Sequence, residues 1–423
     1  MSRWIVSLAG SVFLGITLFA FDGRGWAEES APARAEEAVL MDAVMETPSR
    51  SDLEPADEVS KPQERFSREW WESRGISVST SYTAEGFTGA YGGADAKHRA
   101  QYLGGVGTSL TLELSKLKIG RGQVFISGQD IHGRGINMFG LGAVQAPSSL
   151  DNPTFTKLVE AFYSDTYLKD RLSIKVGRQY ADTEFDTAEN GTEFVNSSYG
   201  HIPTVPLPTY PYPSFGGSVW FTPTERISAG VGVYKGNYVS AQDPVDEAAS
   251  PSLKGAFTIA EVQFKTFSNQ AAHCSVVRVG TWQQGRGAWL TNQGVITATD
   301  PVRNYGVYAT ADYSFGKRSE GNRAPGVFFQ WGWAPADRNA ISGYWGTGIA
   351  YPGLISRRKQ DSAGLGVTQV KLATGERESI VELFYKWQAN KYFFVQPDLQ
   401  WVHSPAGDGR NALLTAVRLT MTL

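Results

Sequence analysis

The sequence predicts an all-β protein, a 16-stranded antiparallel β-barrel that crosses a membrane. Segments in which apolar and polar side chains alternate recur along most of the chain, and this period of two is that of a β-strand. Their number is even, and short and long connections alternate between them, as in transmembrane barrels. The final segment, Ala412 to Leu423, is itself a strand, so we expect it to pair with the first strand and close the sheet.

The composition agrees with a barrel in a membrane. The 423 residues include 46 glycines, 12% aromatic and only 19% charged residues, and the mean hydropathy is -0.26. Such a chain is not apolar overall, because only alternate residues of each strand meet lipid. A net charge of -3 and the absence of any Lys/Arg-rich run predict no nucleic-acid partner. The single Cys274 and five scattered histidines predict no disulfide framework, no metal site and no cofactor.

The first 65 residues divide into two predicted parts. Residues 1–27 resemble a signal peptide, with Arg3, an apolar run from Ile5 to Phe21 and the small-residue exit Gly25-Trp26-Ala27. A retained membrane anchor is the alternative. Residues 28–65 carry eleven acidic and four basic residues, and we expect a mostly disordered periplasmic linker. The barrel domain is then residues 66–423.

Sixteen segments carry the strand pattern. They are Ile76 to Tyr82, Tyr102 to Ser115, Gln123 to Ile131, Leu158 to Leu168, Arg171 to Arg178, Gly217 to Phe221, Arg226 to Tyr234, Ala256 to Phe267, Ala272 to Trp282, Asn304 to Phe315, Gly326 to Trp333, Gly343 to Leu354, Ala363 to Leu372, Ser379 to Trp387, Tyr392 to Trp401 and Ala412 to Leu423.

The connections fall into two classes in alternation. Lys169-Asp170 is typical of the short class, whereas 131–156, 179–215, 236–255 and 283–303 are long. The brief connection 373–377 is the exception on the long side. Both chain ends lie on the short side, which in bacterial outer-membrane barrels is the periplasmic side. We therefore expect a barrel in a Gram-negative outer membrane, surrounded by its lipid, with both termini periplasmic.

Aromatic residues are predicted to form two belts, one at each membrane interface. Those expected near the short turns are Trp70, Trp71, Trp220, Phe221, Phe315, Trp387, Tyr392 and Phe393; those expected near the long loops are Trp282, Trp331, Trp333, Trp345 and Trp401. The alternative is that these are core aromatics of a soluble β-protein. A soluble barrel of this size would need a very large filled interior, which favours the membrane.

Several motifs, taken in order along the chain, resemble the carbohydrate-selective porins of the OprB type. They are WWESRGISVSTSYTAEGFTGAYGG near the start, VEAFYSDTYLKDRLSIKVG, then KVGRQYADTEFDTAENGTEFVNSSYG and YPYPSFGGSVWFTPTERISAGVGVY, and finally VELFYKWQANKYFFVQPDLQWVHSP. The similarity runs from about Trp70 to Leu423. It implies a sixteen-stranded outer-membrane barrel, loops folded inward to narrow the pore, and passive uptake of sugars.

The parity of the strands independently predicts which side chains face the lumen. They are Glu113, Arg226, Glu261, Gln263, Lys265, Arg278, Asp312, Glu382, Lys386, Gln396, Asp398, Gln400 and Arg418. Amides and both charge signs are mixed, which suits neutral hydroxyl-bearing ligands better than ions. Our predicted sugar-contacting residues are Glu261, Arg278, Asp398 and Arg418, with Arg178 and Asp182 at the root of the longest loop. An interior charge satisfied by a strand neighbour is the alternative for each.

Two loops are predicted to narrow the lumen, 131–156 and 179–215. The second contains the proline-rich run from His201 to Pro213, whose fixed φ angles stiffen an extended path. The alternative for this run is an exposed extracellular lid. Asp182, Glu184 and Asp186 lack the spacing of a calcium loop, so we expect no metal there.

The preferred function is passive, carbohydrate-selective diffusion of mono- or oligosaccharides, without enzymatic activity. No G-x-S-x-G, HExxH or Walker A run is present. The alternative is an outer-membrane or secreted hydrolase, a lipase or glycosidase, that uses dispersed carboxylates such as Glu261 and Asp398. The sequence leaves both a monomer and a homotrimer open.

Overall fold

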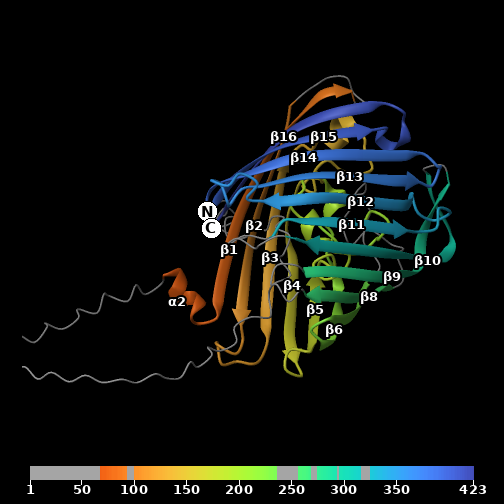
Figure 1. Ribbon diagram of the computed structural model, residues 1–423. Coiled ribbons are helices and arrows are strands. Elements are labelled where there is room, and N and C mark those ends of the chain that lie inside the picture. The colour runs from red at the N-terminus through yellow and green to blue at the C-terminus, as the bar shows by residue number, and fades with distance from the viewer. Residues whose placement is uncertain (1–66, 93–99, 236–255, 268–273, 293–294, 316–323) are drawn as a thin grey trace, which may run out of the picture.

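Sixteen strands close into a single antiparallel barrel in the computed structural model, which describes residues 67–92, 100–235, 256–267, 274–292, 295–315 and 324–423 (Figure 1). Each strand pairs with its neighbours in sequence, and the last pairs with the first. The strands are β1 (Ile76–Gly92), β2 (Gln101–Glu113), β3 (Gln123–Gly133), β4 (Phe155–Tyr167), β5 (Leu172–Gln179), β6 (Ser214–Thr224), β7 (Ile227–Lys235), β8 (Ala256–Phe267), β9 (Cys274–Asn292), β10 (Val295–Ser314), β11 (Gly326–Trp333), β12 (Ile341–Pro352), β13 (Ser362–Leu372), β14 (Arg377–Asn390), β15 (Phe393–His403) and β16 (Asn411–Thr422).

The helical elements are short and lie outside the sheet. They are α2 (Arg68–Glu72), η1 (Asn137–Leu141), η2 (Glu189–Gly191), α3 (Ser197–Gly200) and η3 (Pro405–Gly407). Within the described ranges no helix is both long enough and apolar enough to cross a membrane. The predicted signal peptide and acidic linker lie outside the described residues.

The predicted closure between the last strand and the first is confirmed, but its register differs from the prediction. We expected β16 to pair with Ile76 to Tyr82, whereas it pairs with residues 81–92, and Ile76 to Phe87 pair with β2. The offset between the two edges of β1 is the stagger that tilted strands need in order to close a barrel. It also requires β1 to extend ten residues beyond its predicted end.

Side chains along the strands alternate between the inside and the outside of the barrel, apart from a few β-bulges. In β11, Val327, Phe329 and Trp331 are exposed on the outer surface, while Phe328 and Gln330 are buried inside. β7 and β15 repeat this pattern. An outer surface of large apolar side chains is the surface that a bilayer requires.

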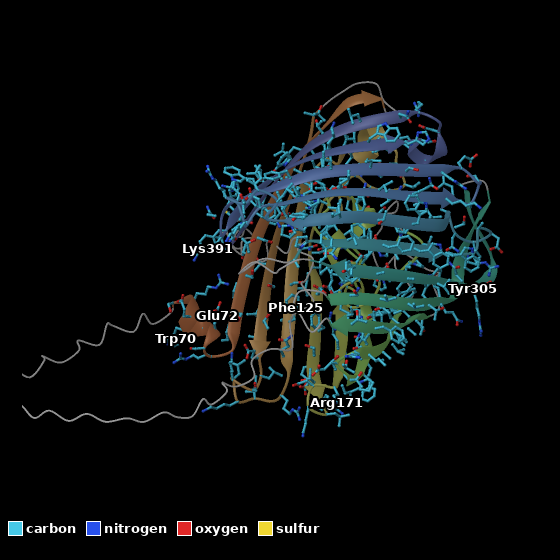
Figure 2. The ribbon with its side chains drawn as sticks, in the orientation of Figure 1. Trp70, Glu72, Phe125, Arg171, Tyr305 and Lys391 are labelled. Atoms are coloured by element: carbon cyan, nitrogen blue, oxygen red, sulfur yellow. The ribbon has the colours of Figure 1, made fainter. Side chains whose placement is uncertain are left out.

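Exposed aromatic residues lie toward both ends of the outer surface. Trp331, Trp333, Trp345 and Trp401 lie toward the long-loop end of their strands, and Phe221, Trp387 and Tyr392 toward the short-turn end. Arg171 and Lys391, in short turns, and Tyr305 mark opposite ends of the barrel (Figure 2). The belt prediction is wrong for two residues. Trp282 is buried and Trp220 partly buried inside the barrel, because each shares the inward parity of its strand.

Candidate functional site

The connection between β5 and β6, residues 180–213, lies inside the barrel, and we call it the inward loop. Phe185 and Ile202 of this loop are fully buried against the wall residues Phe257, Trp282 and Tyr308. Burial of these large side chains stabilises the docked loop by roughly 1.5–3 kcal/mol each. The loop and the wall therefore form one core, and the prediction that this loop enters the barrel is confirmed.

The proline-rich part of the inward loop is buried rather than exposed. Ile202, Val205 and Leu207 are at most 2% accessible, so the predicted alternative of an exposed lid is wrong for these residues. Prolines have no N–H group, so an extended path rich in proline can be buried with fewer donors to satisfy. The run turns back toward the start of the loop, where Ala181 N donates to Pro208 O at 2.7 Å.

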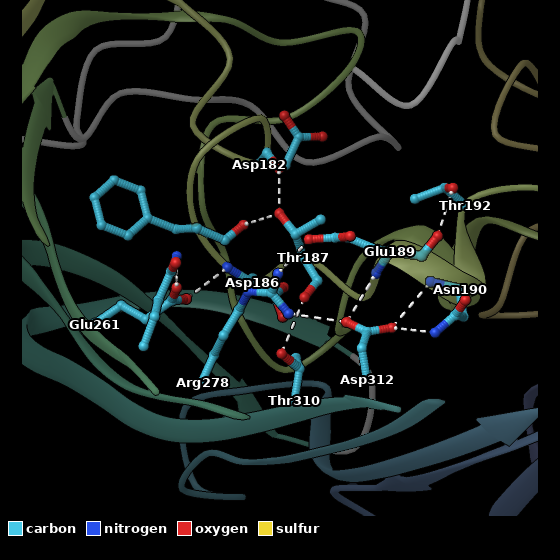
Figure 3. Close-up of polar contacts among 12 residues, drawn as sticks. Asp182, Asp186, Thr187, Glu189, Asn190, Thr192, Glu261, Arg278, Thr310 and Asp312 are labelled. Atoms are coloured by element: carbon cyan, nitrogen blue, oxygen red, sulfur yellow. Dashed lines mark hydrogen bonds and ion pairs between the residues drawn. The ribbon is translucent and has the colours of Figure 1, made fainter. Parts of the chain in front are cut away.

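Three wall carboxylates, Glu261 of β8, Asp312 of β10 and Glu382 of β14, hold the backbone of the inward loop, and we call them the anchor carboxylates. Figure 3 shows Glu261 and Asp312 with the loop residues that they bind. All three are at most 4% accessible. Loop N–H groups donate to them as follows: Asp186 N to Glu261 at 2.9 Å, Glu189 N and Asn190 N to Asp312 at 3.0 and 2.9 Å, and Val195 N and Asn196 N to Glu382 at 2.6 and 3.0 Å.

The anchoring explains how irregular backbone is tolerated inside the barrel. A buried N–H group without a partner costs about 1–3 kcal/mol, and a carboxylate is the strongest acceptor a side chain offers. Asp312 and Glu382 each accept two successive N–H groups, one with each oxygen. The anchor carboxylates thus fix the inward loop to the wall at three positions along its sequence, and the loop does not rest loosely in the lumen.

The 134–154 loop between β3 and β4 is fixed in the same way. Val144 N and Gln145 N both donate to Glu378 at 2.8 Å, and Ala406 N donates to it at 2.7 Å. Glu378 is the second residue of β14 and is fully buried. One carboxylate therefore ties two separate connections to the long-loop end of the barrel.

Arg278, a predicted sugar contact, is instead enclosed by the inward loop. Its Nη1 lies 2.8 Å from Asp312 Oδ2 and its Nη2 lies 2.9 Å from Glu189 Oε1. The side chain of Arg278 is 5% exposed, whereas that of Glu189 is 46% exposed. Arg278 therefore compensates an anchor carboxylate, and Glu189 is the member of this group that solvent reaches.

The other predicted wall residues are also buried and engaged. Glu261 accepts from Tyr308 at 2.7 Å in addition to the loop backbone. Asp398 Oδ1 accepts from Gln400 Nε2 at 2.9 Å. Arg418 Nε donates to Glu85 Oε1 at 2.6 Å. These residues line the inside of the barrel, as the parity predicts, but loops and neighbouring strands cover them.

Arg178 and Asp182, predicted at the root of the loop, are not brought together. Arg178 shares the outward row of Val176 and faces Phe215, both of which are exposed on the outer surface. Asp182 is half-buried inside and accepts from Thr209 Oγ1. The carboxylate of Glu184, two residues after Asp182, has a different partner, since it accepts from Ser218 Oγ.

Asp186 and His201 form a buried pair within the inward loop, with His201 Nδ1 2.9 Å from Asp186 Oδ2. Burial raises the pKa of Asp186 to about 6, although the imidazole opposes the rise. Burial lowers the pKa of His201, but Asp186 outweighs it, and the net shift is upward. Burial also raises the pKa of Asp182, against its bond from Thr209 and the charges of His201 and Lys175.

Comparison with known proteins agrees with this geometry. Residues 97–423 match the carbohydrate-selective porins of the OprB family. The chain belongs to this family. Among curated protein sequences, none matches this OprB-family chain.

Solved structures of porins resemble this OprB-family chain in fold. The high-pH structure of Pseudomonas putida OprB has a TM-score of 0.72 at 16% identity, over 84% of this chain and 96% of that one. The low-pH structure of the same protein gives 0.57 at 16% identity, over 84% and 95%. An anion-selective porin from Comamonas acidovorans gives 0.52 at 10% identity, over 82% and 99%. At these identities the likeness concerns the fold alone.

Sequence reasoning missed what the inner carboxylates of this porin do. Asp312 and Glu382 were assigned to the lumen by parity, but their role as anchors was not predicted. Glu85 and Glu378 were not singled out at all. Glu85 carried a usable signal, since it lies on the inward row between Thr83 and Phe87. No sequence pattern indicates that a carboxylate accepts from loop backbone, because the donors are main-chain groups.

Proposed function

We propose that this OprB-family chain allows mono- and oligosaccharides to diffuse passively across a bacterial outer membrane. One observation carries the proposal: a fixed, internally packed loop occupies the inside of a closed sixteen-strand barrel. A barrel of this size without such a loop would enclose a wide aqueous channel. A narrowed lumen is what discrimination between solutes of different size and shape requires.

The chemistry of the lumen supports sugars rather than ions of one sign as the permeant solute. Glu189 and Glu193 bring negative charge to the inside, and Lys386 pairs with Glu193 at 3.0 Å. Paired charges leave little net field, whereas their remaining donors and acceptors suit neutral hydroxyl groups.

The hydrolase alternative has little to support it. Glu261 and Asp398 would have to act as a catalytic carboxyl pair, but both are at most 5% accessible. Glu261 is occupied by loop backbone and Tyr308, and Asp398 by Gln400. The family and the fold are those of a channel rather than an enzyme.

Liposome swelling and planar-bilayer recording test the proposal together. Purified protein should cause swelling in isosmotic glucose, and sugars should reduce its ion current in a concentration-dependent manner. No sugar product should appear in the same vesicles. Hydrolysis of the added sugar, or ion conduction that no sugar reduces, would contradict the proposal.

The expected orientation places the short turns and both termini in the periplasm. Together with this orientation, we propose that residues 1–27 are removed on export and that residues 28–65 form a periplasmic linker. Edman sequencing of the mature protein should begin at Glu28. Protease added to intact cells should leave this linker uncut, and cleavage there from outside would contradict the orientation.

The outer face of β1–β3 supports self-association of copies in the membrane, with a homotrimer as the proposed state. Beside larger outward residues such as Val78 and Tyr102, this face carries a group of small ones: Thr80, Ala84, Gly86, Thr88, Gly104, Thr108 and Gly128. Small residues let two membrane surfaces approach closely. Polar groups also face outward there, since His132 Nδ1 lies 2.7 Å from Asp130 Oδ1, and a carboxylate that faces lipid is unfavourable unless it is covered.

A further inference from the structure

A sugar passing through the lumen can touch only side chains that solvent reaches. Four of the six residues predicted from sequence, Glu261, Arg278, Asp398 and Arg418, are at most 8% accessible. Their polar atoms are already engaged: Glu261 accepts from the inward loop, and Arg278 binds Asp312. Asp398 accepts from Gln400, and Arg418 donates to Glu85 of β1. They cannot contact a sugar unless the loop leaves the wall, so the contact surface must lie elsewhere.

Trp220 is a large aromatic side chain on the inner wall that is only partly buried. It stands opposite Ser173 on β5 and Gly230 on β7. A Cβ at Gly230 would overlap the indole, so the ring lies directly against the backbone of β7. Phe185 of the inward loop packs beside it, with ring centroids 5.1 Å apart and planes inclined by 31°. The ring is thereby held rigidly, and its Nε1 is buried without a hydrogen-bond partner among the described residues, so only part of the ring surface is open to the lumen.

Three polar residues, Ser218, Lys175 and Glu184, lie next to Trp220 along the same wall. Ser218 is two residues before Trp220 on the inner face of β6, about 7 Å away at the rise of a strand. Lys175 stands directly opposite Ser218, and its Nζ donates to Thr183 Oγ1 at 3.2 Å. Glu184 of the inward loop accepts from Ser218 Oγ. Lys175 is only 9% accessible, and its Nζ also lies 4.2 Å from the centroid of the Phe162 ring, whereas Glu184 is partly accessible. A carboxylate has about four acceptor sites, so Glu184 retains capacity for a ligand.

We propose that this part of the wall, Trp220 with Glu184 of the inward loop, is the sugar-contacting surface of the channel. A rigid aromatic face packs against the apolar face of a pyranose ring, while an acceptor beside it binds the ring hydroxyls. This inference rests on the proposed function, since it names where that function's substrate is held.

Current block in planar bilayers tests the surface directly, with glucose and maltotriose as the probes. Replacing Trp220 by Ala or Leu removes the aromatic face, and the half-blocking sugar concentration should rise about fivefold or more. Trp220→Phe keeps an aromatic face and should stay within about twofold of wild type. Glu184→Gln keeps a partner for Ser218 but removes the charge, and a rise of about threefold in the half-blocking concentration is expected.

Trp331→Ala is the matched control, because Trp331 is 42% exposed on the outer surface. It should leave sugar block unchanged. Only variants that retain the heat-dependent gel mobility of the folded barrel are compared, and Trp220→Leu serves if Trp220→Ala does not fold. If sugars block the wild type and the Trp220 and Glu184 variants at the same half-blocking concentration, the proposed contact surface is wrong, while the channel function stands. Ion conduction by wild type without any sugar block would instead overturn the proposed function itself.

Discussion

Arg418 Nε lies 2.6 Å from Glu85 Oε1, and the two residues stand directly opposite each other in the register between β16 and β1. Both are buried inside the barrel, Arg418 at 8% and Glu85 at 1% accessibility. The pair joins the last strand to the first, which are separated by more than 300 residues of chain. A buried ion pair at this position makes the seam sensitive to the loss of either partner.

Replacing Arg418 by Met should therefore destabilise the folded barrel by about 3–5 kcal/mol, because Glu85 is left as a buried charge without its partner. Urea unfolding of the protein in lipid vesicles measures this change. Sugar block in the surviving folded fraction should be unaffected, since Arg418 does not reach the lumen solvent.

A double variant separates the seam pair from general packing. Arg418→Met combined with Glu85→Leu should cost less than the sum of the single changes, because no unpaired charge remains. Arg410→Ala removes an exposed ion pair with Asp408 and should change stability by less than about 1 kcal/mol. Strict additivity of the two seam variants would contradict coupling between Arg418 and Glu85.

Replacing Glu382 by Ala should loosen the inward loop. Val195 N and Asn196 N lose their shared acceptor in a buried position, at a cost of about 1.5–3 kcal/mol for each charge-assisted hydrogen bond. We expect a larger single-channel conductance, noisier open-channel current and faster proteolysis within residues 180–213. Glu382→Gln retains one acceptor oxygen and should show a smaller effect.

Glu376→Gln is the control for the loosened loop, because Glu376 is exposed in the turn before β14. Its conductance should equal that of wild type. Unchanged conductance and proteolysis in Glu382→Ala would mean that hydrophobic packing alone holds the loop and that the carboxylate anchors are dispensable.

The strand count and the closure could be predicted because each leaves a repeating signal, whereas the inward course of the longest loop was implied by the resemblance to OprB-type porins. Period-two alternation identifies strands, and long connections at every second junction identify one end of the barrel. The end of β1 was less predictable. Residues 83–92 are rich in Gly and Thr and lack the apolar alternation that marks the other strands.

The roles of individual inner residues could not be predicted to the same extent. Parity assigns Glu261 and Arg278 to the inner face, but an acidic or basic residue there has the same pattern whether it faces water or loop backbone. The error at Arg178 was avoidable. It continues the outward row of Leu172, Ile174 and Val176, and only its position beside the long loop suggested otherwise.

Replacing Gly86 by Trp should weaken association of copies without harming the barrel. A Cβ at Gly86 meets nothing within 4 Å, and the position is exposed on the outer surface. A bulky side chain there would prevent close approach across the β1–β3 face. Cross-linking and light scattering in mild detergent should show a shift from trimer toward monomer.

Ala229→Trp is the matched control for the association test. Ala229 is exposed on the outer face of β7, between Ile227 and Val231, away from the proposed contact. It should leave the oligomer intact. An intact trimer in Gly86→Trp, with folded barrels in both variants, would contradict the proposed contact face.

The stability of the docked inward loop should fall as pH rises from about 4 to above 6.5. Burial first, opposed by His201, raises the pKa of Asp186 to about 6, while Glu261 adds to the rise. The folded state then holds this proton more tightly than the unfolded chain, so stability is greatest below the unfolded value near 3.8 and is lost through about 6. His201, whose pKa is also raised on balance, adds a further loss above about 6.5.

Thermal unfolding in detergent between pH 4 and 8.5 measures this dependence. Asp186→Asn should flatten the lower part of the profile, by at most about 3 kcal/mol at roughly 1.36 kcal/mol per pKa unit. His201→Gln should flatten the upper part and move the Asp186 titration to higher pH, because the cation that opposes the pKa rise is gone. His403→Gln, exposed at the end of β15, should change neither. A profile identical in all four proteins would show that the buried pair does not govern how firmly the loop is held.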